Sequence, residues 1–320
     1  MKKNHNQSYN TENYLLEIQS YYFLMTTQYL YHQVVTLNSN KYTMKHSIFE
    51  TCPMCDEDSA KSNLWCPIDD HGFITVQCNN CGLIYVKNPY DKDSMKEYYS
   101  NYYSEVHQEN QIFNIQREKM YELEFNFLLN FKKSGRVLDV GCSGGQFLQH
   151  FRKAGFHCEG VEFGIEACIE AQKSFKVHVG EFPLINFESK YDVIVFRGCI
   201  EHVDNPKKYL KKAISLLNPN GIIFITATQN RTSLTCDLFR GDWNMHTPKE
   251  HLFHFAVSDF VKFFKEHGLV SYTENNFYLE TPYVNVENDL RLVLEKLKNP
   301  GSKIECPPFF DNMMTTVYQF

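Results

Sequence analysis

Residues 136–148 constrain the fold more than any other part of the chain. Residues 137–140 form a short apolar run with one acid inside it, the pattern of a buried parallel strand. Gly141, Gly144 and Gly145 follow at once, so the chain turns sharply and its bare backbone can approach whatever lies above the strand end. Apolar residues at helical spacing come next. A strand, a glycine turn and a helix in this order predict the nucleotide-binding opening of a doubly wound α/β sheet.

The glycine spacing separates two classes of ligand. A dinucleotide fold carries Gly-x-Gly-x-x-Gly, which seats a pyrophosphate on a helix N-terminus. Here the pattern is Gly-x-x-Gly-Gly, preceded by Asp139 in the strand. This arrangement resembles motif I of the class I S-adenosyl-L-methionine (SAM) dependent methyltransferases, whose ligand has no phosphate. The alternative is a glycine turn that only packs a helix against a strand.

The chain after residue 136 alternates regularly between strands and helices, and polar residues follow the strand ends. Glu162 ends the second strand about 20 residues beyond the glycine turn, where a carboxylate accepts the ribose hydroxyls of an adenosine. Gly180 and Glu181 end the third strand, and the resemblance implies that they face the adenine. The full set expected to bind the cofactor is Asp139, Gly141, Cys142, Ser143, Gly144, Glu162, Gly180, Glu181 and Arg197.

The resemblance extends over about residues 115–320. Residues 200–203, Ile-Glu-His-Val, and residues 250–255, Glu-His-Leu-Phe-His-Phe, are similar to the branch that holds the ubiquinone-pathway O-methyltransferases and many sugar methyltransferases. The resemblance implies a Rossmann-like, seven-stranded sheet. Similar deoxysugar C-methyltransferases carry a sizeable further C-terminal domain, whereas this sequence ends at Phe320. We therefore expect methylation of an oxygen or a nitrogen.

Two Cys-x-x-Cys pairs precede this domain. Cys52 and Cys55 form the first, and Cys78 and Cys81 the second. Four thiolates at this spacing complete a closed tetrahedral shell that suits structural Zn²⁺. The spacing predicts a zinc ribbon that supports folding and takes no part in catalysis, and N-terminal modules of this kind resemble those of sugar and surface-polysaccharide methyltransferases. Redox dithiols or buried thiols are the alternatives.

Three residues are candidates for the acceptor side. His202 should lie at the end of the fourth strand, and histidine is the usual base near neutral pH. His251 is a second candidate base. Glu201 is the third, because with His202 it could hold a divalent ion that acidifies a substrate hydroxyl. The alternative for His202 is a buried imidazole that bonds to backbone.

Composition narrows the possible partners. The chain has 320 residues, 43% of them hydrophobic and 22% charged, as in an ordinary globular protein. A net charge of −6 argues against nucleic acid as a partner, although Lys207, Lys208, Lys211 and Lys212 form one basic stripe. Eleven unevenly spaced cysteines and the lack of a clear signal peptide favour a reduced, cytoplasmic protein. We expect no membrane insertion, and the oligomeric state is left open.

The expected domain order is an N-terminal extension at residues 1–50, the zinc ribbon at 51–88, a connector with a helical lead-in at 89–133 and the methyltransferase domain at 134–320. The extension is either without a fold of its own, with Met44 as a possible true start, or an aromatic helix over residues 14–35. The tyrosine-rich connector is either a surface segment or a cover over the cofactor cleft.

Three functions follow from these patterns. The leading one is a SAM-dependent methyltransferase that acts on a small molecule, a sugar or a sugar-containing metabolite. The second is methylation of RNA or protein, with the zinc ribbon binding the macromolecule. The third is a non-enzymatic interaction protein with a degenerate methyltransferase body, which the intact glycine turn and Glu162 argue against.

Overall fold

The computed structural model describes residues 44–106 and 111–320. The chain divides into two compact units, residues 1–45 and residues 46–320, and the fold below is that of the second. The predictions for residues 1–43 lie outside the described residues. The α-helices of the second unit are α2 (Lys92–Val106), α3 (Gln111–Leu128), α4 (Gln146–Lys153), α5 (Ile169–Gln172), α6 (Pro206–Leu216), α7 (Leu234–Phe239), α8 (Val257–Glu266) and α9 (Val286–Lys298).

A seven-stranded sheet forms the centre of this unit, in the order β10-β11-β8-β7-β4-β5-β6. Strand β11 runs antiparallel to both of its neighbours, and the other neighbouring pairs are parallel. The predicted seven-stranded α/β sheet is confirmed. Its strands are β4 (Arg136–Val140), β5 (His157–Glu162), β6 (Lys176–Val179), β7 (Tyr191–Arg197), β8 (Leu217–Gln229), β10 (Ser271–Asn275) and β11 (Met313–Gln319).

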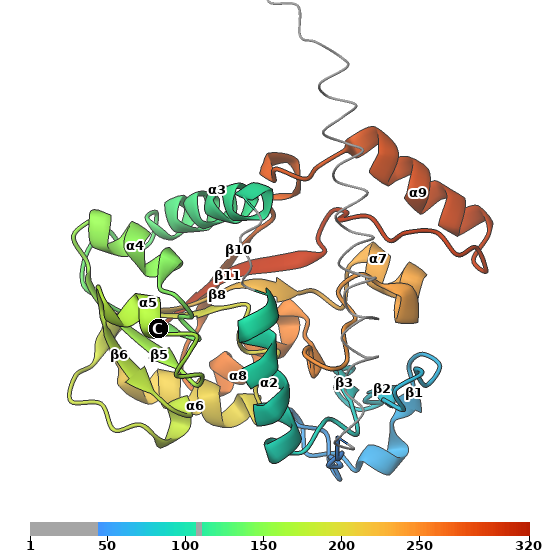
Figure 1. Ribbon diagram of the computed structural model, residues 1–320, viewed down its shortest axis with the longest axis horizontal. Helices are drawn as coiled ribbons and strands as arrows, with labels where there is room; N and C mark the ends of the chain where they lie inside the picture. The colour runs from blue at the N-terminus through green and yellow to red at the C-terminus, as the bar shows by residue number, and fades with distance from the viewer. Residues whose placement is uncertain (1–43, 107–110) are drawn as a thin grey trace, which may run out of the picture. The chain divides into compact units, whose positions relative to one another are not determined.

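Helices cover both faces of the sheet, with α3 and α4 on one side and α6 and α8 on the other (Figure 1). Alternate residues of β7 divide between the two apolar cores, as the pleat requires. Val193 and Val195 join the core under α3 and α4, whereas Ile194 and Phe196 join the core under α6 and α8. A central strand buried on both faces explains the unbroken apolar run in its sequence.

The cysteine module, residues 51–88, contributes the short strands β1 (Asn63–Leu64), β2 (Thr75–Gln77) and β3 (Ile84–Val86). A fourth strand of this sheet, β9 (Phe253–His254), comes from far along the chain and pairs antiparallel with β3. Tyr85 and Phe253 are fully buried in the core that also holds α6 and α8. The module therefore shares both a sheet and a core with the rest of the unit.

The sequence placed one strand wrongly. The aromatic and apolar residues at 277–284 predict a strand, but Tyr278–Glu280 is a 3-10 turn, and the strand lies earlier, at β10. Thr281 and Glu280 donate their amides to the Phe277 carbonyl, which closes the turn. The side chains of β10 are mostly exposed, so this edge strand lacks the apolar alternation by which strands are recognised.

Candidate active site

The glycine turn after β4 is as tight as its sequence predicts. Gly141 has φ +82°, and a Cβ placed on it would lie 2.8 Å from Sγ of Cys199 on the loop after β7. Gly160 of β5 is equally constrained, because a Cβ there would lie 2.5 Å from Sγ of Cys142. Cys142 therefore packs inward, and Ser143 turns the chain with φ +45°. Only glycine allows three strand ends to approach each other this closely.

Asp139 lies at the centre of this turn with an unsatisfied oxygen. Its side chain is buried, and Oδ1 has no hydrogen-bond partner among the described residues. Burial raises the pKa of Asp139 to about 7, and the nearby Arg197 guanidinium opposes the rise. A buried carboxylate oxygen without a partner is costly unless a ligand satisfies it. An ammonium group would do so.

Arg197, at the end of β7, is held by a residue that the sequence did not single out. Its Nε donates to Oε2 of Glu124 at 2.6 Å, and its Nη2 donates to Oε1 at 3.2 Å. The guanidinium carbon also lies 4.3 Å from the centre of the Tyr121 ring. Glu124 and Tyr121 come from α3, so the predicted lead-in helix packs directly against the expected cofactor site. The helical period of α3 was visible in the sequence, but the partner of Arg197 was not.

Glu162 ends β5 with its carboxylate directed into the glycine turn. Oε2 accepts the Ser143 amide at 3.0 Å, and Oε1 accepts the Phe163 and Gly164 amides at 2.8 and 3.1 Å. Burial raises the pKa of Glu162, although these amide donors oppose the rise. The structure thus brings Glu162 and Ser143, two residues of the expected cofactor set, into direct contact.

Gly180 and Glu181 follow β6 at the same edge of the sheet. Gly180 has φ +136°, and a Cβ on it would meet no other group within 4 Å. Glu181 accepts a hydrogen bond from Nζ of Lys92 at 3.5 Å. Lys92 also lies 3.3 Å from Asp204, so the first turn of α2 is tied to two strand-end loops.

The three residues predicted for the acceptor side do come together. The ligand atoms of Glu201, His202 and His251 all lie within 4.8 Å of one another. Nε2 of His202 is 4.0 Å from Oε1 of Glu201, and the two imidazole centres are 4.8 Å apart. Of His202 and Glu201, only His202 is accessible to solvent, because its side chain is 26% exposed and that of Glu201 is 0% exposed.

Hydrogen bonds distinguish the two imidazoles. Nδ1 of His251 lies 2.7 Å from the Met245 carbonyl, which can only accept, so this nitrogen carries the proton. Its Nε2 then accepts from the Gln229 amide, 3.0 Å away. Both nitrogens of His251 are therefore engaged within the protein. His202 has Nδ1 at 3.1 Å from the Tyr99 hydroxyl.

Burial sets the charge of this cluster. It lowers the pKa of His202 to about 3, with a further lowering from the His251 charge and an opposing effect from a hydrogen bond to the Glu250 backbone, so the imidazole is neutral at pH 7. Burial also lowers the pKa of His251. The same cause raises the pKa of Glu201 to about 7, against the hydrogen bonds donated by Thr228 and Gln229. The pKa values of Glu201 and His202 therefore differ widely, although the two side chains lie next to each other.

A protein-family model described as a methyltransferase domain matches residues 113–274, just over half of the chain. This chain belongs to the methyltransferase-domain family. The match spans the glycine turn, Glu162 and Glu181 at the ends of β5 and β6, and the Glu201–His202–His251 cluster. The expected class I SAM-dependent methyltransferase domain is confirmed.

Among curated proteins, the chain is 35% identical over 111 residues to a ubiquinone biosynthesis O-methyltransferase of Maricaulis maris, covering 31% of this chain and 42% of that protein. It is 30% identical over 145 residues to the mitochondrial ubiquinone biosynthesis O-methyltransferase of Saccharomyces cerevisiae, covering 40% and 45%. The chain thus spans less than half the length of these relatives. A solved SAM-dependent methyltransferase of Thermotoga maritima, titled a possible histamine N-methyltransferase, aligns at 16% identity and a TM-score of 0.47, covering 68% of this chain and 97% of that one.

Helix α2, which is drawn in front of α8 in Figure 1, reaches the Glu201–His202–His251 cluster through its tyrosines. Tyr99 of α2 contacts His202, and the Tyr98 hydroxyl donates to Oε1 of Glu250 at 2.5 Å. The structure thus places two tyrosines of the connector beside His202 and Glu250. Paired tyrosines were the available signal, but no spacing rule tied them to His202.

The cysteine module fits the metal expected of it. Sγ of Cys52 lies 3.6 Å from Sγ of Cys81, and Sγ of Cys55 lies 3.6 Å from Sγ of Cys78. Bonds of about 2.3 Å from a tetrahedral zinc would set the sulfurs about 3.8 Å apart. The hydrogen bond from Cys52 lowers the pKa of the Cys81 thiol to about 5. An all-sulfur shell with a preformed tetrahedral spacing suits structural Zn²⁺.

The module is also linked by hydrogen bonds to the Glu201–His202–His251 cluster, through the segment that carries His251. The Val86 amide donates to the Leu252 carbonyl at 2.9 Å, and the Leu252 amide donates to the Glu201 carbonyl at 2.9 Å. Arg231 adds a second link, because its Nη2 donates to the Cys81 carbonyl at 3.4 Å and to Asp259 at 2.9 Å. The cysteine module is therefore joined by hydrogen bonds to the segment next to His251 and to α8.

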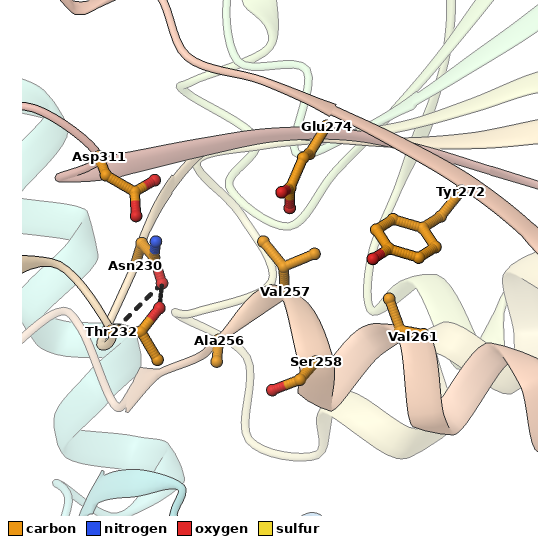
Figure 2. Close-up of a pocket in the computed structure, with 9 residues that line it drawn as sticks. All are labelled: Asn230, Thr232, Ala256, Val257, Ser258, Val261, Tyr272, Glu274 and Asp311. Carbon is orange, nitrogen blue, oxygen red and sulfur yellow. Dashed lines mark hydrogen bonds between the residues drawn. The ribbon is translucent and has the colours of Figure 1, made fainter.

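A cavity of about 320 Å³ lies between the start of α8 and the edge strand β10 (Figure 2). Ser258, Tyr272, Glu274 and Asp311 line it, together with apolar side chains of α8. None of its lining residues is a predicted site residue.

Within the described residues, no helix is long and apolar enough to cross a membrane.

Proposed function

We propose that this chain transfers a methyl group from SAM to an oxygen or a nitrogen of a small molecule, and that the acceptor is a sugar or a sugar-containing metabolite. The observation that carries the proposal is the contact between Glu201, His202 and His251 at the strand edge that also holds the glycine turn. Ligands of doubly wound sheets bind at this edge. When bound, SAM supplies a methyl group that its sulfonium already activates.

The cofactor side would use the residues at the ends of β4, β5 and β6. Asp139 holds a buried, unpaired oxygen that suits the ammonium group of SAM, and Arg197 provides a positive charge nearby that Glu124 orients. Glu162 has a carboxylate fixed by backbone amides, which suits ribose hydroxyls. Gly180 leaves open space for a flat ring, and Glu181 lies beside it. The backbone of Gly141, Cys142, Ser143 and Gly144 would form the floor.

The acceptor side would use His202 as the group that takes the proton. Its imidazole is neutral and reachable, whereas Glu201 is fully buried behind it. A pKa near 3 makes an isolated imidazole a weak base, so the nearby carboxylate of Glu201 must stabilise the imidazolium that forms. His251, with both nitrogens engaged, would position His202 and would not accept the proton itself.

The choice of acceptor rests on resemblance. The curated relatives are named as ubiquinone biosynthesis O-methyltransferases, so a small acceptor is the class that they favour. A sugar is favoured by the four-cysteine module in front of the domain. The same cluster of Glu201, His202 and His251 could instead hold a divalent ion, since a carboxylate and imidazoles suit several transition metals.

The rival proposal of RNA or protein methylation is weakened by the lysine stripe. Nζ of Lys207 lies 2.5 Å from Oδ1 of Asp56, and Nζ of Lys212 lies 5.6 Å from the centre of the Phe187 ring. Half of the stripe thus has partners within the fold.

We also propose a reducing, cytoplasmic location, because every cysteine among the described residues is a free thiol.

Label transfer tests the proposal. The full chain is incubated with methyl-tritiated SAM and a fractionated extract of the source cell, with Gly144→Trp as the variant that fills the cofactor site. Label in the small-molecule or polysaccharide fraction supports the proposal, and mass spectrometry of that fraction names the acceptor. Label that nuclease or protease releases overturns it in favour of a macromolecular acceptor.

A further inference from the structure

Helix α9 presents an apolar stripe that the described part of the protein leaves uncovered. Val286, Leu290, Leu294 and Leu297 are between 43% and 52% exposed. Their spacing of four, four and three residues places them on one face of the helix, along about 16 Å of its length. Contiguous apolar side chains at a surface mark an interaction site more often than scattered ones do.

The helix that carries this stripe is firmly anchored on its other side. Leu292 and Val293 are buried. Nζ of Lys296 donates to the Ser302 carbonyl at 2.7 Å, and Oδ2 of Asp289 accepts the Tyr278 hydroxyl at 2.7 Å. The side chain of Asn285 caps the first turn by accepting the Asn288 amide. The stripe therefore sits on a fixed helix, as an interface requires.

We propose that the stripe is the core of a twofold dimer interface, in which α9 packs antiparallel against α9 of a second copy of this chain. A twofold interface requires one surface to match itself. Leu290 and Leu294 lie near the middle of the stripe, so antiparallel packing about their midpoint places each leucine against the other leucine of the second copy. Ridges of this kind interdigitate at ordinary helix-packing distances.

Charge complementarity favours this occupant. Glu287 in the first turn and Lys298 in the last turn are both exposed, and neither has an ion-pair partner among the described residues. At about 100° per residue they lie on the same flank of the stripe. Reversal of one helix about a twofold axis brings Glu287 of each copy beside Lys298 of the other. Two symmetric ion pairs would then fix the antiparallel direction.

The surface near the first turn of α9 can extend the contact. Leu279 and Phe310 are exposed apolar residues. Phe310 lies beside Tyr278, at 6.3 Å between ring centres, and Tyr278 bonds to Asp289 of α9. A specific dimer buries roughly 1,200 Å² or more in total, so such flanking side chains are needed beyond a single helix pair.

Sedimentation equilibrium of the full chain over a series of concentrations tests the inference. We expect a dimer, and we expect Leu290→Glu or Leu294→Glu to raise the dissociation constant by at least about tenfold, since a buried charge replaces an apolar contact. Val270→Glu adds the same charge to an exposed apolar residue outside α9, immediately before β10, and should leave the dimer intact. Thermal unfolding of each variant checks that it is folded.

A charge exchange tests the antiparallel direction. Glu287→Lys and Lys298→Glu should each weaken association through repulsion, and the double variant should restore it. A monomeric wild-type chain overturns the inference. So does a dimer that neither leucine variant weakens, and so does failure of the double variant to restore association. None of these outcomes depends on methyl transfer, so the inference and the proposed function can fail separately.

Discussion

The imidazole centres of His202 and His251 lie 4.8 Å apart, yet the two rings differ in hydrogen bonding and in exposure. His251 is fixed through the Met245 carbonyl and the Gln229 amide, while His202 remains partly exposed beside Tyr99. Of these two similar side chains, His251 has both ring nitrogens hydrogen-bonded within the protein, whereas the side chain of His202 is 26% exposed. This difference leads directly to the first prediction.

Replacement of His202 should abolish transfer and spare cofactor binding. We expect His202→Gln to lower the rate of methyl transfer by roughly 100-fold to 10,000-fold, the usual contribution of a general base. The dissociation constant for S-adenosylhomocysteine should stay the same, because His202 lies on the acceptor side. His157→Gln, an exposed histidine at the start of β5, is the matched control. Equal losses in both variants would count against a catalytic His202.

Glu201 should give the transfer rate its pH dependence. Its pKa is raised to about 7, so the carboxyl is protonated below that pH and ionised above it. We expect the rate to rise by up to about tenfold per pH unit below pH 7 and then to level off, because only the ionised form stabilises an imidazolium. Glu201→Gln should remove this limb of the profile. A profile unchanged in that variant would assign the titration elsewhere.

The same carboxyl should make the fold less stable as the pH rises. The folded-state pKa of Glu201 lies above the ordinary glutamate value, so its contribution to stability is present at low pH and is lost as the pH rises through about 7. Glu201→Gln, which cannot ionise, should therefore lose less stability between pH 5 and pH 8, a window set by this raised pKa. Urea unfolding at the two pH values measures the difference.

Asp139 should link cofactor affinity to pH. Its pKa is raised to about 7 by burial, so below that pH the carboxyl is increasingly protonated and cannot pair with an ammonium group. The dissociation constant for S-adenosylhomocysteine should rise by up to about tenfold per pH unit below 7. Calorimetry of Asp139→Asn should show weaker binding with this pH dependence gone. Retained pH dependence would contradict the assignment.

Loss of metal should disable the acceptor side first. Cys81→Ser should lower the zinc content and loosen β3, which bonds to the Leu252 carbonyl next to His251. We expect faster hydrogen exchange at the Val86 amide, which donates to the Leu252 carbonyl, and at the Leu252 amide, which donates to the Glu201 carbonyl. We also expect a loss of methyl transfer, with S-adenosylhomocysteine still bound. Cys66→Ser, a buried cysteine outside the four, is the control that should keep its zinc. Unchanged exchange at these two amides after zinc loss would show that the module does not support the segment next to His251.

The ion pair between Glu124 and Arg197 should be costly to break on one side only. Glu124→Gln leaves a guanidinium that is only 16% exposed without its countercharge, which for buried pairs costs about 3 to 5 kcal/mol. The double variant Glu124→Leu with Arg197→Met should unfold closer to the wild-type temperature, because no lone charge remains. Calorimetric melting of the three proteins decides between a structural pair and one that the fold does not need.

The sequence alone determined the parts that local chemistry fixes. Gly141 and Gly145 could be recognised from their spacing after the strand, since both take a left-handed backbone conformation that favours glycine. The unbroken apolar run of β7 likewise indicates a strand buried on both faces. The four-cysteine metal site could be recognised from the sequence, because two Cys-x-x-Cys pairs are enough to complete a tetrahedral shell. His202 and Glu201 could be nominated because a strand end fixes where they lie.

Only the tertiary structure decided what contacts these residues. The partners of the site come from distant segments: Glu124 reaches Arg197 from α3, Tyr99 reaches His202 from α2, and β3 pairs with β9. No periodicity encodes such contacts, since they depend on how helices and loops pack over the sheet. The exposed strand β10 escaped recognition for a related reason, because its place is set by pairing with β11 and not by its own apolar pattern.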